Sequence, residues 1–257
     1  QQLSQLSLLC RASFYFGFLI KGGEDMLDLR QACFNQGSFS LLANFTVPRG
    51  ARVAVIGPSG GGKSTLLHGI SGFLYPNAGE VLWNGETMPK HPGERPLSIL
   101  FQDHNLFPHL CVADNVAVGI DPSIRLSEEQ VSLVSVALSQ VGLSEKAAAF
   151  PRELSGGQQG RVGLARILLR KRPLILLDEP FSALGPALKD EMLDVLSEIL
   201  DITNATALMV THDTNDAISF GDQAILVAEG QASPPQQIKP LLANPPLALK
   251  GYLGNRV

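Results

Sequence analysis

A glycine-rich run between a predicted strand and a predicted helix constrains this chain more than any other segment. It fits the pattern G-x-x-x-x-G-K-[ST], and it follows the apolar segment 52–56, the context that the motif requires. Glycines let successive backbone N–H groups curl around phosphate oxygens, and the start of the helix adds the positive end of its dipole. We therefore predict a nucleotide-phosphate site, with Lys63 at the β- and γ-phosphates and the Ser64 hydroxyl on Mg²⁺. The residues of the run are Gly57, Pro58, Ser59, Gly60, Gly61, Gly62, Lys63, Ser64 and Thr65.

A second phosphate-site signal follows the apolar run 173–177, which we expect to be a strand covered on both faces. The run ends in Asp178 and Glu179. Asp178 is predicted to lie beside the metal ion that Ser64 holds. Glu179 is predicted to accept a proton from the attacking water, a role that contributes typically ~10²–10⁴-fold to a rate. The segment alone also permits a simpler interpretation, in which both carboxylates only cap the helix that follows.

The rest of the chain predicts an α/β fold with a mostly parallel sheet. Further strands are expected at 98–101, 206–210 and 223–227, and they alternate with helical segments. Between about 103 and 163 helical signals replace strand signals, and Ser127 opens one helix with a capping box. We interpret this stretch as a helical subdomain inserted into the sheet. Because five prolines follow Gly230, the tail is predicted to be mostly loop.

Composition excludes several other classes of protein. The chain has 257 residues, of which 45% are hydrophobic and 17% charged, and this excludes a disordered chain. Its net charge of −4 gives no basic bias, so we expect no nucleic-acid partner. The three cysteines are scattered, which fits neither a disulfide framework nor a zinc site.

Residues 1–25 stand apart from the α/β pattern. The first methionine is Met26, and the uncharged stretch 12–20 is too short to span a bilayer. The basic start and the small-residue cleavage site of a secretory signal are both missing. We expect these residues to be an upstream extension or a misassigned start, with the working chain beginning at Met26.

A third motif separates one class of nucleotide-binding protein from the others. Leu154 is followed by Ser155, Gly156, Gly157 and Gln158, and these small residues open a predicted helix with exposed N–H groups for an anion. Because the 57–65 loop already provides one phosphate cradle, a second cradle in the same chain implies two half-sites. With these motifs in the expected order across 26–230, the sequence resembles the ATPase subunit of an ABC transporter.

This resemblance implies an architecture and an assembly. The fold would be a P-loop NTPase with a mostly parallel core sheet, a small antiparallel N-terminal β subdomain and an inserted helical subdomain. In that family two copies form a head-to-tail homodimer, in which the 155–158 segment of one copy clasps the ATP held by the other.

The resemblance also implies roles for individual residues. Gln102 matches the glutamine that contacts Mg²⁺ and water and reports to the membrane subunit, and His212 matches the switch histidine near the γ-phosphate. Phe34 lies at about the right distance before the loop to stack on adenine. Phe39 is a rival, and both rings could equally belong to the core. Gly185 departs from the pattern, because the family usually has Asp there, and this puts the tightness of coupling across the dimer in doubt.

A closer resemblance concerns the cargo. Segments 97–110 and 112–119 are similar to thiamine importer ATPases, and the 45 residues after His212 are too few for the regulatory domain of sugar and polyamine importers. This implies import of thiamine and its phosphates, with an integral membrane permease and a periplasmic thiamine-binding protein as partners, at the cytoplasmic face of the inner membrane. The segment 103–109 is expected either to dock the permease loops or simply to pack within its subdomain. Alternatives are an importer ATPase for iron or an inorganic anion, a non-transport ABC ATPase, and a P-loop kinase.

Overall fold

The computed structural model describes residues 26–102, 105–182 and 184–253. These residues form two compact units. The sheet unit contains residues 26–102, 172–182 and 204–253, and the helical unit contains 105–171 and 184–203. The predictions made for residues 1–25 and for Asp103 lie outside the described residues.

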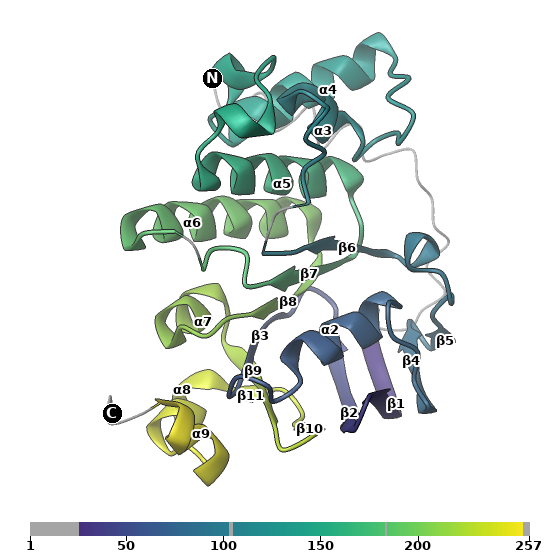
Figure 1. The fold of residues 1–257 in the computed structure, drawn as a ribbon, viewed down its shortest axis with the longest axis vertical. Helices are drawn as coiled ribbons and strands as arrows, with labels where there is room; N and C mark the ends of the chain where they lie inside the picture. The colour runs from purple at the N-terminus through teal and green to yellow at the C-terminus, as the bar shows by residue number, and fades with distance from the viewer. Residues whose placement is uncertain (1–25, 103–104, 183, 254–257) are drawn as a thin grey trace. The chain divides into compact units, whose positions relative to one another are not determined.

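The sheet unit combines a parallel core with an antiparallel N-terminal part (Figure 1). The strand order is β5-β4-β1-β2-β10-β9-β3-β8-β7-β6, with β11 paired to β9. Strands β9, β3, β8, β7 and β6 are parallel neighbours, whereas β1, β2, β4 and β5 pair antiparallel. The strands are β1 (Met26–Gln36), β2 (Phe39–Pro48), β3 (Arg52–Ile56), β4 (Ala78–Trp83), β5 (Glu86–Thr87), β6 (Leu97–Leu100), β7 (Leu174–Asp178), β8 (Thr206–Val210), β9 (Gln223–Ala228), β10 (Gln231–Ala232) and β11 (Gln236–Gln237). The predicted α/β fold, with a parallel core sheet and an antiparallel N-terminal part, is confirmed.

Two layers of side chains cover the parallel strands. Successive residues of a strand point to opposite faces. Val53 and Val55 of β3 belong to a core that includes Leu66 and Ile70 of helix α2 (Lys63–Ser71). Ala54 and Ile56 of β3 belong to a second cluster with residues of α7 (Thr214–Phe220), α8 (Ile238–Ala243) and α9 (Leu247–Leu253). The unbroken apolar runs of these strands follow from this double covering.

The tail contains more structure than the prediction of loop allowed. Strands β10 and β11 and helices α8 and α9 all follow Gly230. Pro240 is the third residue of α8, and Pro246 directly precedes α9. The N–H groups of a first helical turn have no partner within the helix, so proline costs little there. The prolines start helices here instead of preventing them.

The helical unit consists of α3 (Val112–Ala117), α4 (Glu128–Gln140), α5 (Gly156–Arg170) and α6 (Pro186–Thr203). Helix α5 packs against α3, α4 and α6 (Figure 1). The capping box predicted at Ser127 is present, because Ser127 and Gln130 each bond the backbone N–H of the other. The unit extends past the expected end near 163, since α5 continues to Arg170 and the later helix α6 joins it.

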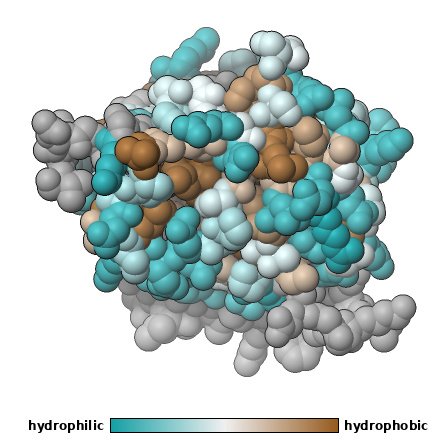
Figure 2. Space-filling model, turned by 90° about the horizontal axis from the view of Figure 1, so that it is seen from below, coloured by the Kyte–Doolittle hydropathy of each residue, from teal (hydrophilic) through white to brown (hydrophobic). Residues whose placement is uncertain are grey.

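One face of the molecule carries both hydrophobic and polar side chains. On the face seen in Figure 2 the hydrophobic side chains show as patches between polar side chains. Isolated apolar side chains are normal on protein surfaces. Among the described residues, no helix combines the length and the apolar character needed to cross a lipid bilayer.

Candidate functional site

The loop after β3 has a backbone that glycine makes possible. Gly57 has φ 147°, and a Cβ at this position would lie 2.0 Å from the carbonyl oxygen of Val227. Gly62 has φ 107° and forms the N-cap of α2, without a side-chain cap. The first N–H groups of a helix have no acceptor inside it, so here they are available to an external anion. This geometry is that of a phosphate cradle.

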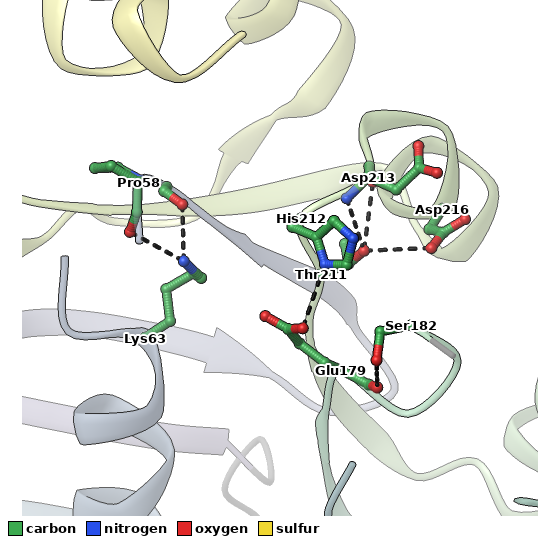
Figure 3. A network of polar contacts seen from close by, with 9 residues as sticks. Pro58, Lys63, Glu179, Ser182, Thr211, His212, Asp213 and Asp216 are labelled. Atoms are coloured by element: carbon green, nitrogen blue, oxygen red, sulfur yellow. Dashed lines mark hydrogen bonds and ion pairs between the residues drawn. The ribbon is translucent and has the colours of Figure 1, made fainter. Parts of the chain in front are cut away.

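Lys63 reaches back over this loop. Its side chain is buried, and Nζ donates to the carbonyl oxygens of Gly57 at 2.8 Å and Pro58 at 3.0 Å (Figure 3). An ammonium group has three N–H donors, so these two bonds leave one for a phosphate oxygen. Burial lowers the pKa of Lys63, and the charges of Glu179 and Asp178 oppose that shift.

Asp178 ends β7 beside Ser64, the first hydroxyl of α2. Burial raises the pKa of Asp178, the adjacent Glu179 raises it further, and a hydrogen bond from Ser64 opposes the change. Hydroxyl and carboxylate oxygens are the ligands that Mg²⁺ prefers. The structure therefore brings together two of the three predicted metal-binding residues in a donor set that suits this ion.

Gln102, the third of these residues, follows β6. Leu100 of β6 pairs with Leu177 of β7 in parallel register. Carboxyl ends of parallel strands meet at one edge of a sheet. Gln102 and Asp178 therefore lie at the same edge of the sheet unit.

Glu179 has an unusual backbone and a defined side-chain neighbour. Its φ is 47°, in the left-handed region that residues other than glycine seldom adopt. Its N–H donates to the carbonyl oxygen of Val210 at 3.1 Å, and its carbonyl oxygen accepts from the hydroxyl of Ser182. Nδ1 of His212 lies 3.3 Å from Oε2 of Glu179 (Figure 3). The structure thus brings together the two predicted catalytic residues that follow β7 and β8.

The turn that presents His212 depends on a residue that sequence reasoning missed. Thr211 is buried, and its hydroxyl accepts a hydrogen bond from the N–H of Asp213 at 3.1 Å. The same hydroxyl lies 3.4 Å from a carboxylate oxygen of Asp216 (Figure 3). Asp213 in turn caps α7 through the N–H of Asn215. The sequence signal for this role is the position of Thr211, between the predicted strand 206–210 and the N-cap residue Asp213.

The 155–158 segment starts α5 in the helical unit. Ser155 accepts from the N–H of Gln158, and Gln158 accepts from the N–H of Ser155, which completes a capping box. A Cβ at Gly157 would lie 2.4 Å from Leu188, so the close approach of α6 requires glycine. The N–H groups of Gly156 and Gly157 have no acceptor within the helix. The segment therefore offers donors to an anion, as predicted for it.

Phe34 occupies a different environment from the one that adenine stacking needs. Its ring is fully buried in the core and packs on Gly69 of α2. A ring with no exposed face has no surface to offer to a base, so this placement argues against Phe34. Phe39 is only partly buried and lies against Gly62 at the phosphate loop. Of the two rings, only Phe39 therefore has a free surface beside the phosphate loop.

Comparison with known proteins agrees with the nucleotide-binding geometry of the site. A family model described as ABC transporter matches residues 42–182, more than half of the chain. The chain belongs to the ABC transporter family. The matched range includes the 57–65 loop, the 155–158 segment and the Asp178–Glu179 pair.

Several relatives of this ABC protein carry a more specific name. The thiamine import ATP-binding protein ThiQ of Cereibacter sphaeroides is 55% identical over 230 residues, which cover 89% of this chain and 100% of that protein. The protein of the same name from Escherichia coli K12 is 47% identical over 191 residues, covering 73% and 82% of the two chains.

Solved structures agree with the ABC fold. The cbiO1 protein of Clostridium perfringens, described as part of the ABC transporter complex cbiONQ, has a TM-score of 0.75 at 25% identity, covering 86% of this chain and 92% of that chain. A nucleotide-free ATP-binding cassette from an ABC transporter has a TM-score of 0.77 at 24% identity, covering 90% and 100%. The expected P-loop architecture of an ABC cassette is confirmed.

Gly185 is the position at which this ABC cassette departs from the family pattern. It directly precedes α6, and a Cβ there would meet nothing within 4 Å. Its backbone is not in the left-handed region. No steric or backbone reason therefore explains the glycine.

Proposed function

We propose that this chain is the ATP-hydrolysing subunit of an importer for thiamine and its phosphates. The cargo assignment is supported by the full-length similarity to a thiamine import ATP-binding protein, at 55% identity. The ATPase assignment is supported by the placement of Glu179 and His212 beside the phosphate loop of the sheet unit.

In this proposal the 57–65 loop holds the phosphates of ATP. The backbone N–H groups at the start of α2 bind phosphate oxygens, and the remaining donor of Lys63 reaches the β- and γ-phosphates. The aromatic ring of Phe39 stacks on adenine. Backbone donors and one buried ammonium group together favour a triphosphate over an uncharged ligand.

Ser64, Asp178 and Gln102 would hold the Mg²⁺ that accompanies ATP. Bound there, the ion neutralises charge on the phosphate oxygens. The pKa of Asp178 is raised by burial and by Glu179, so a cation at this position favours its ionised form. The ionised carboxylate of Asp178 and the bound ion therefore stabilise each other.

Glu179 is the proton acceptor for the attacking water. Its carboxylate is partly exposed and is held by His212, while its backbone is fixed by Val210 and Ser182. A carboxylate held in one orientation loses less entropy when it receives the proton. His212 acts as the positioning partner of this carboxylate and lies near the γ-phosphate.

The complete site needs a second copy of the chain. We propose a head-to-tail homodimer in which the N–H groups of Gly156 and Gly157 from one copy bind ATP held by the other. This arrangement gives the 155–158 segment an anion to bind, and it places Gly185 near the dimer contact.

The surface of the sheet unit offers a docking place for a membrane permease. Phe73 and Tyr75 are about half exposed, and the ring of Phe73 lies 5.9 Å from that of Phe101 and 6.0 Å from that of His68. Exposed aromatic clusters of this kind are typical of protein interfaces. Because Phe101 precedes Gln102, a permease segment bound here would lie next to a residue of the nucleotide site.

The helical unit carries a second docking element. Phe107 is exposed, and its loop is ordered by Asn115, which is fully buried and bonds both the N–H and the carbonyl oxygen of Phe107. Nη1 of Arg166 donates to the carbonyl oxygen of Asn105 at 2.9 Å and further fixes the loop. An exposed aromatic ring on a loop fixed in this way supports docking of permease loops at this segment.

The proposal is tested by reconstitution at the membrane. The chain is assembled with its permease in liposomes, together with the periplasmic thiamine-binding protein, and ATP hydrolysis on the face carrying this subunit is measured. Addition of thiamine is expected to stimulate hydrolysis. Stimulation by iron or an inorganic anion instead would assign the protein to the alternative cargo class.

A further inference from the structure

Arg95 is a buried cation whose described partners are neutral. It is only 3% exposed. Nη1 donates to the carbonyl oxygens of Gly69 at 3.0 Å and Ile70 at 2.5 Å, and Nε donates to the carbonyl oxygen of Pro89 at 2.8 Å. Within the part of the chain that the structure describes, no carboxylate is paired with it. A charge buried in this way has to be stabilised by dipoles.

Two of these three carbonyl dipoles belong to α2. Gly69 and Ile70 lie in the last turn of α2, where no N–H of the helix itself can donate to their carbonyl oxygens; only the N–H of the C-cap residue Gly72 reaches that of Gly69, at 3.3 Å. The negative end of the helix dipole also favours a cation there. The guanidinium therefore closes the end of the same helix that begins with Lys63 and Ser64.

The backbone of Arg95 belongs to a different element. It lies two residues before β6, and that strand leads directly to Phe101 and Gln102. The planar fork of an arginine spans acceptors on separate segments, which a lysine ammonium does less well. One side chain thus joins the end of α2 to the segment that carries Gln102.

We infer that Arg95 is a positioning residue that transmits ATP binding from α2 to Gln102. This inference rests on the proposed ATPase function. When the phosphates bind at the start of α2, the helix moves as a rigid element, and Arg95 carries that movement into β6. The link places Gln102 for the reaction and couples the phosphate loop to the aromatic surface around Phe73 and Phe101.

Gly72 provides an independent way to disturb the same link. It follows α2 with φ 86°, and a Cβ there would lie 2.6 Å from Nε of Arg95. Gly85 has a similar φ of 78°, but a Cβ there meets nothing within 4 Å. Gly72→Ala and Gly85→Ala therefore share the backbone strain and differ in the contact with Arg95.

The experiment follows hydrogen exchange with and without Mg-ATP in the full chain. In the wild type, Mg-ATP is expected to slow exchange both at 57–65 and at 97–102. Arg95→Met is expected to keep the protection at 57–65 and to lose most of it at 97–102. In steady-state kinetics kcat for ATP falls about tenfold, as for other groups that orient metal ligands, while KM is unchanged.

Two controls separate this link from a general loss of stability. Arg30→Met removes an exposed arginine that pairs with Asp28, and it should leave both protected regions as in the wild type. If Arg95→Met does not fold, the comparison of Gly72→Ala with Gly85→Ala tests the link instead. Only Gly72→Ala should then lose protection at 97–102.

The outcomes that overturn the inference differ from those that overturn the function. Normal protection at 97–102 in Arg95→Met, equal behaviour of the two alanine variants, or no response at 97–102 in the wild type would each disprove the link. No response at 57–65 in the wild type would instead disprove ATP binding at the loop.

Discussion

Nδ1 of His212 lies 3.3 Å from Oε2 of Glu179, although 33 positions separate the two residues in the chain. The pairing follows from the parallel register of β7 and β8, in which Asp178 lies beside Val210. Each residue comes shortly after the end of its strand. The sheet therefore fixes the distance between them, and the carboxylate is oriented before any substrate arrives.

Removing the charge of Glu179 should stop hydrolysis while leaving ATP binding intact. Glu179→Gln keeps the shape of the side chain but accepts no proton, so the rate should fall at least ~10²-fold and an ATP-bound dimer should accumulate. Phosphate release and size-exclusion chromatography measure the two effects. Glu229→Gln is the matched control, because Glu229 is exposed and has a similar φ of 52°. Normal turnover in Glu179→Gln would remove Glu179 from this role.

Asp178→Asn should stabilise the folded chain at neutral pH. Burial and the charge of Glu179 raise the pKa of Asp178, so the folded chain retains a proton that the unfolded chain releases. Stability therefore falls as pH rises from the ordinary Asp pKa, about 3.9, to the raised value. The variant removes this loss, so its Tm should exceed that of the wild type at pH 7 and the difference should shrink below about pH 4.

The same variant should lose the rise in Tm that Mg-ATP gives the wild type. Asp121→Asn is a control of opposite sign, because hydrogen bonds from Ser123 lower the pKa of Asp121. That variant should not gain Tm at neutral pH. An equal Tm for Asp178→Asn and the wild type across this pH range would contradict the assigned environment of Asp178.

Phe34 and Phe39 should respond to alanine in different measurements. Phe39→Ala should weaken ATP affinity, because base–aromatic stacking contributes about 1–3 kcal/mol. Phe34→Ala should instead lower the free energy of unfolding by about 3–5 kcal/mol, since its ring fills the core. Isothermal titration with ATP and urea unfolding separate the two. A loss of affinity in Phe34→Ala without loss of stability would restore Phe34 as the stacking residue.

Gly185→Asp should tighten the ATP-dependent dimer. The position has space for a side chain, and one charge-assisted hydrogen bond across the dimer would strengthen association about tenfold or more. The dimerisation constant is measured by sedimentation in the Glu179→Gln background with ATP. Gly93→Asp adds the same charge at an exposed glycine with equal space and should have no effect. Equal constants for the two variants would show that Gly185 lies away from the dimer contact.

Asn115→Ala should impair communication with the permease. Its Oδ1 accepts from the N–H of Phe107, and the two donors of its Nδ2 are shared among the carbonyl oxygens of Phe107, Leu110 and Cys111, so the loop loses all these contacts at once. We expect permease-stimulated hydrolysis to fall while ATP affinity is unchanged. Ser135→Ala, which removes one exposed hydrogen bond in the same unit, is the control. Unaltered stimulation in Asn115→Ala would argue against the docking role.

The elements predicted well are those whose signal is local. The bounds of β3 and β8 match the expected 52–56 and 206–210. The phosphate loop was predictable because its function resides in backbone N–H groups and consecutive glycines. Helix α5 begins at Gly156, within the segment expected to open it, because Ser155 and Gln158 form a capping box. That box was readable in the sequence as S-x-x-Q.

The elements predicted poorly depend on partners far along the chain. The burial of Phe34 is decided by Gly69, and the role of Thr211 by the turn into α7. Nothing near Arg95 in the sequence indicates that it closes the end of α2. Helices α8 and α9 form because β3 leaves an apolar face, Ala54 and Ile56, to be covered.

The left-handed backbone of Glu179 affects any attempt to raise the thermostability of this protein. Holding a residue other than glycine at φ 47° costs about 1–2 kcal/mol. Glycine would relieve that strain, so a screen for heat resistance alone would favour Glu179→Gly. Given the proposed role of Glu179 as proton acceptor, such a screen would select a more heat-resistant protein that binds ATP without hydrolysing it.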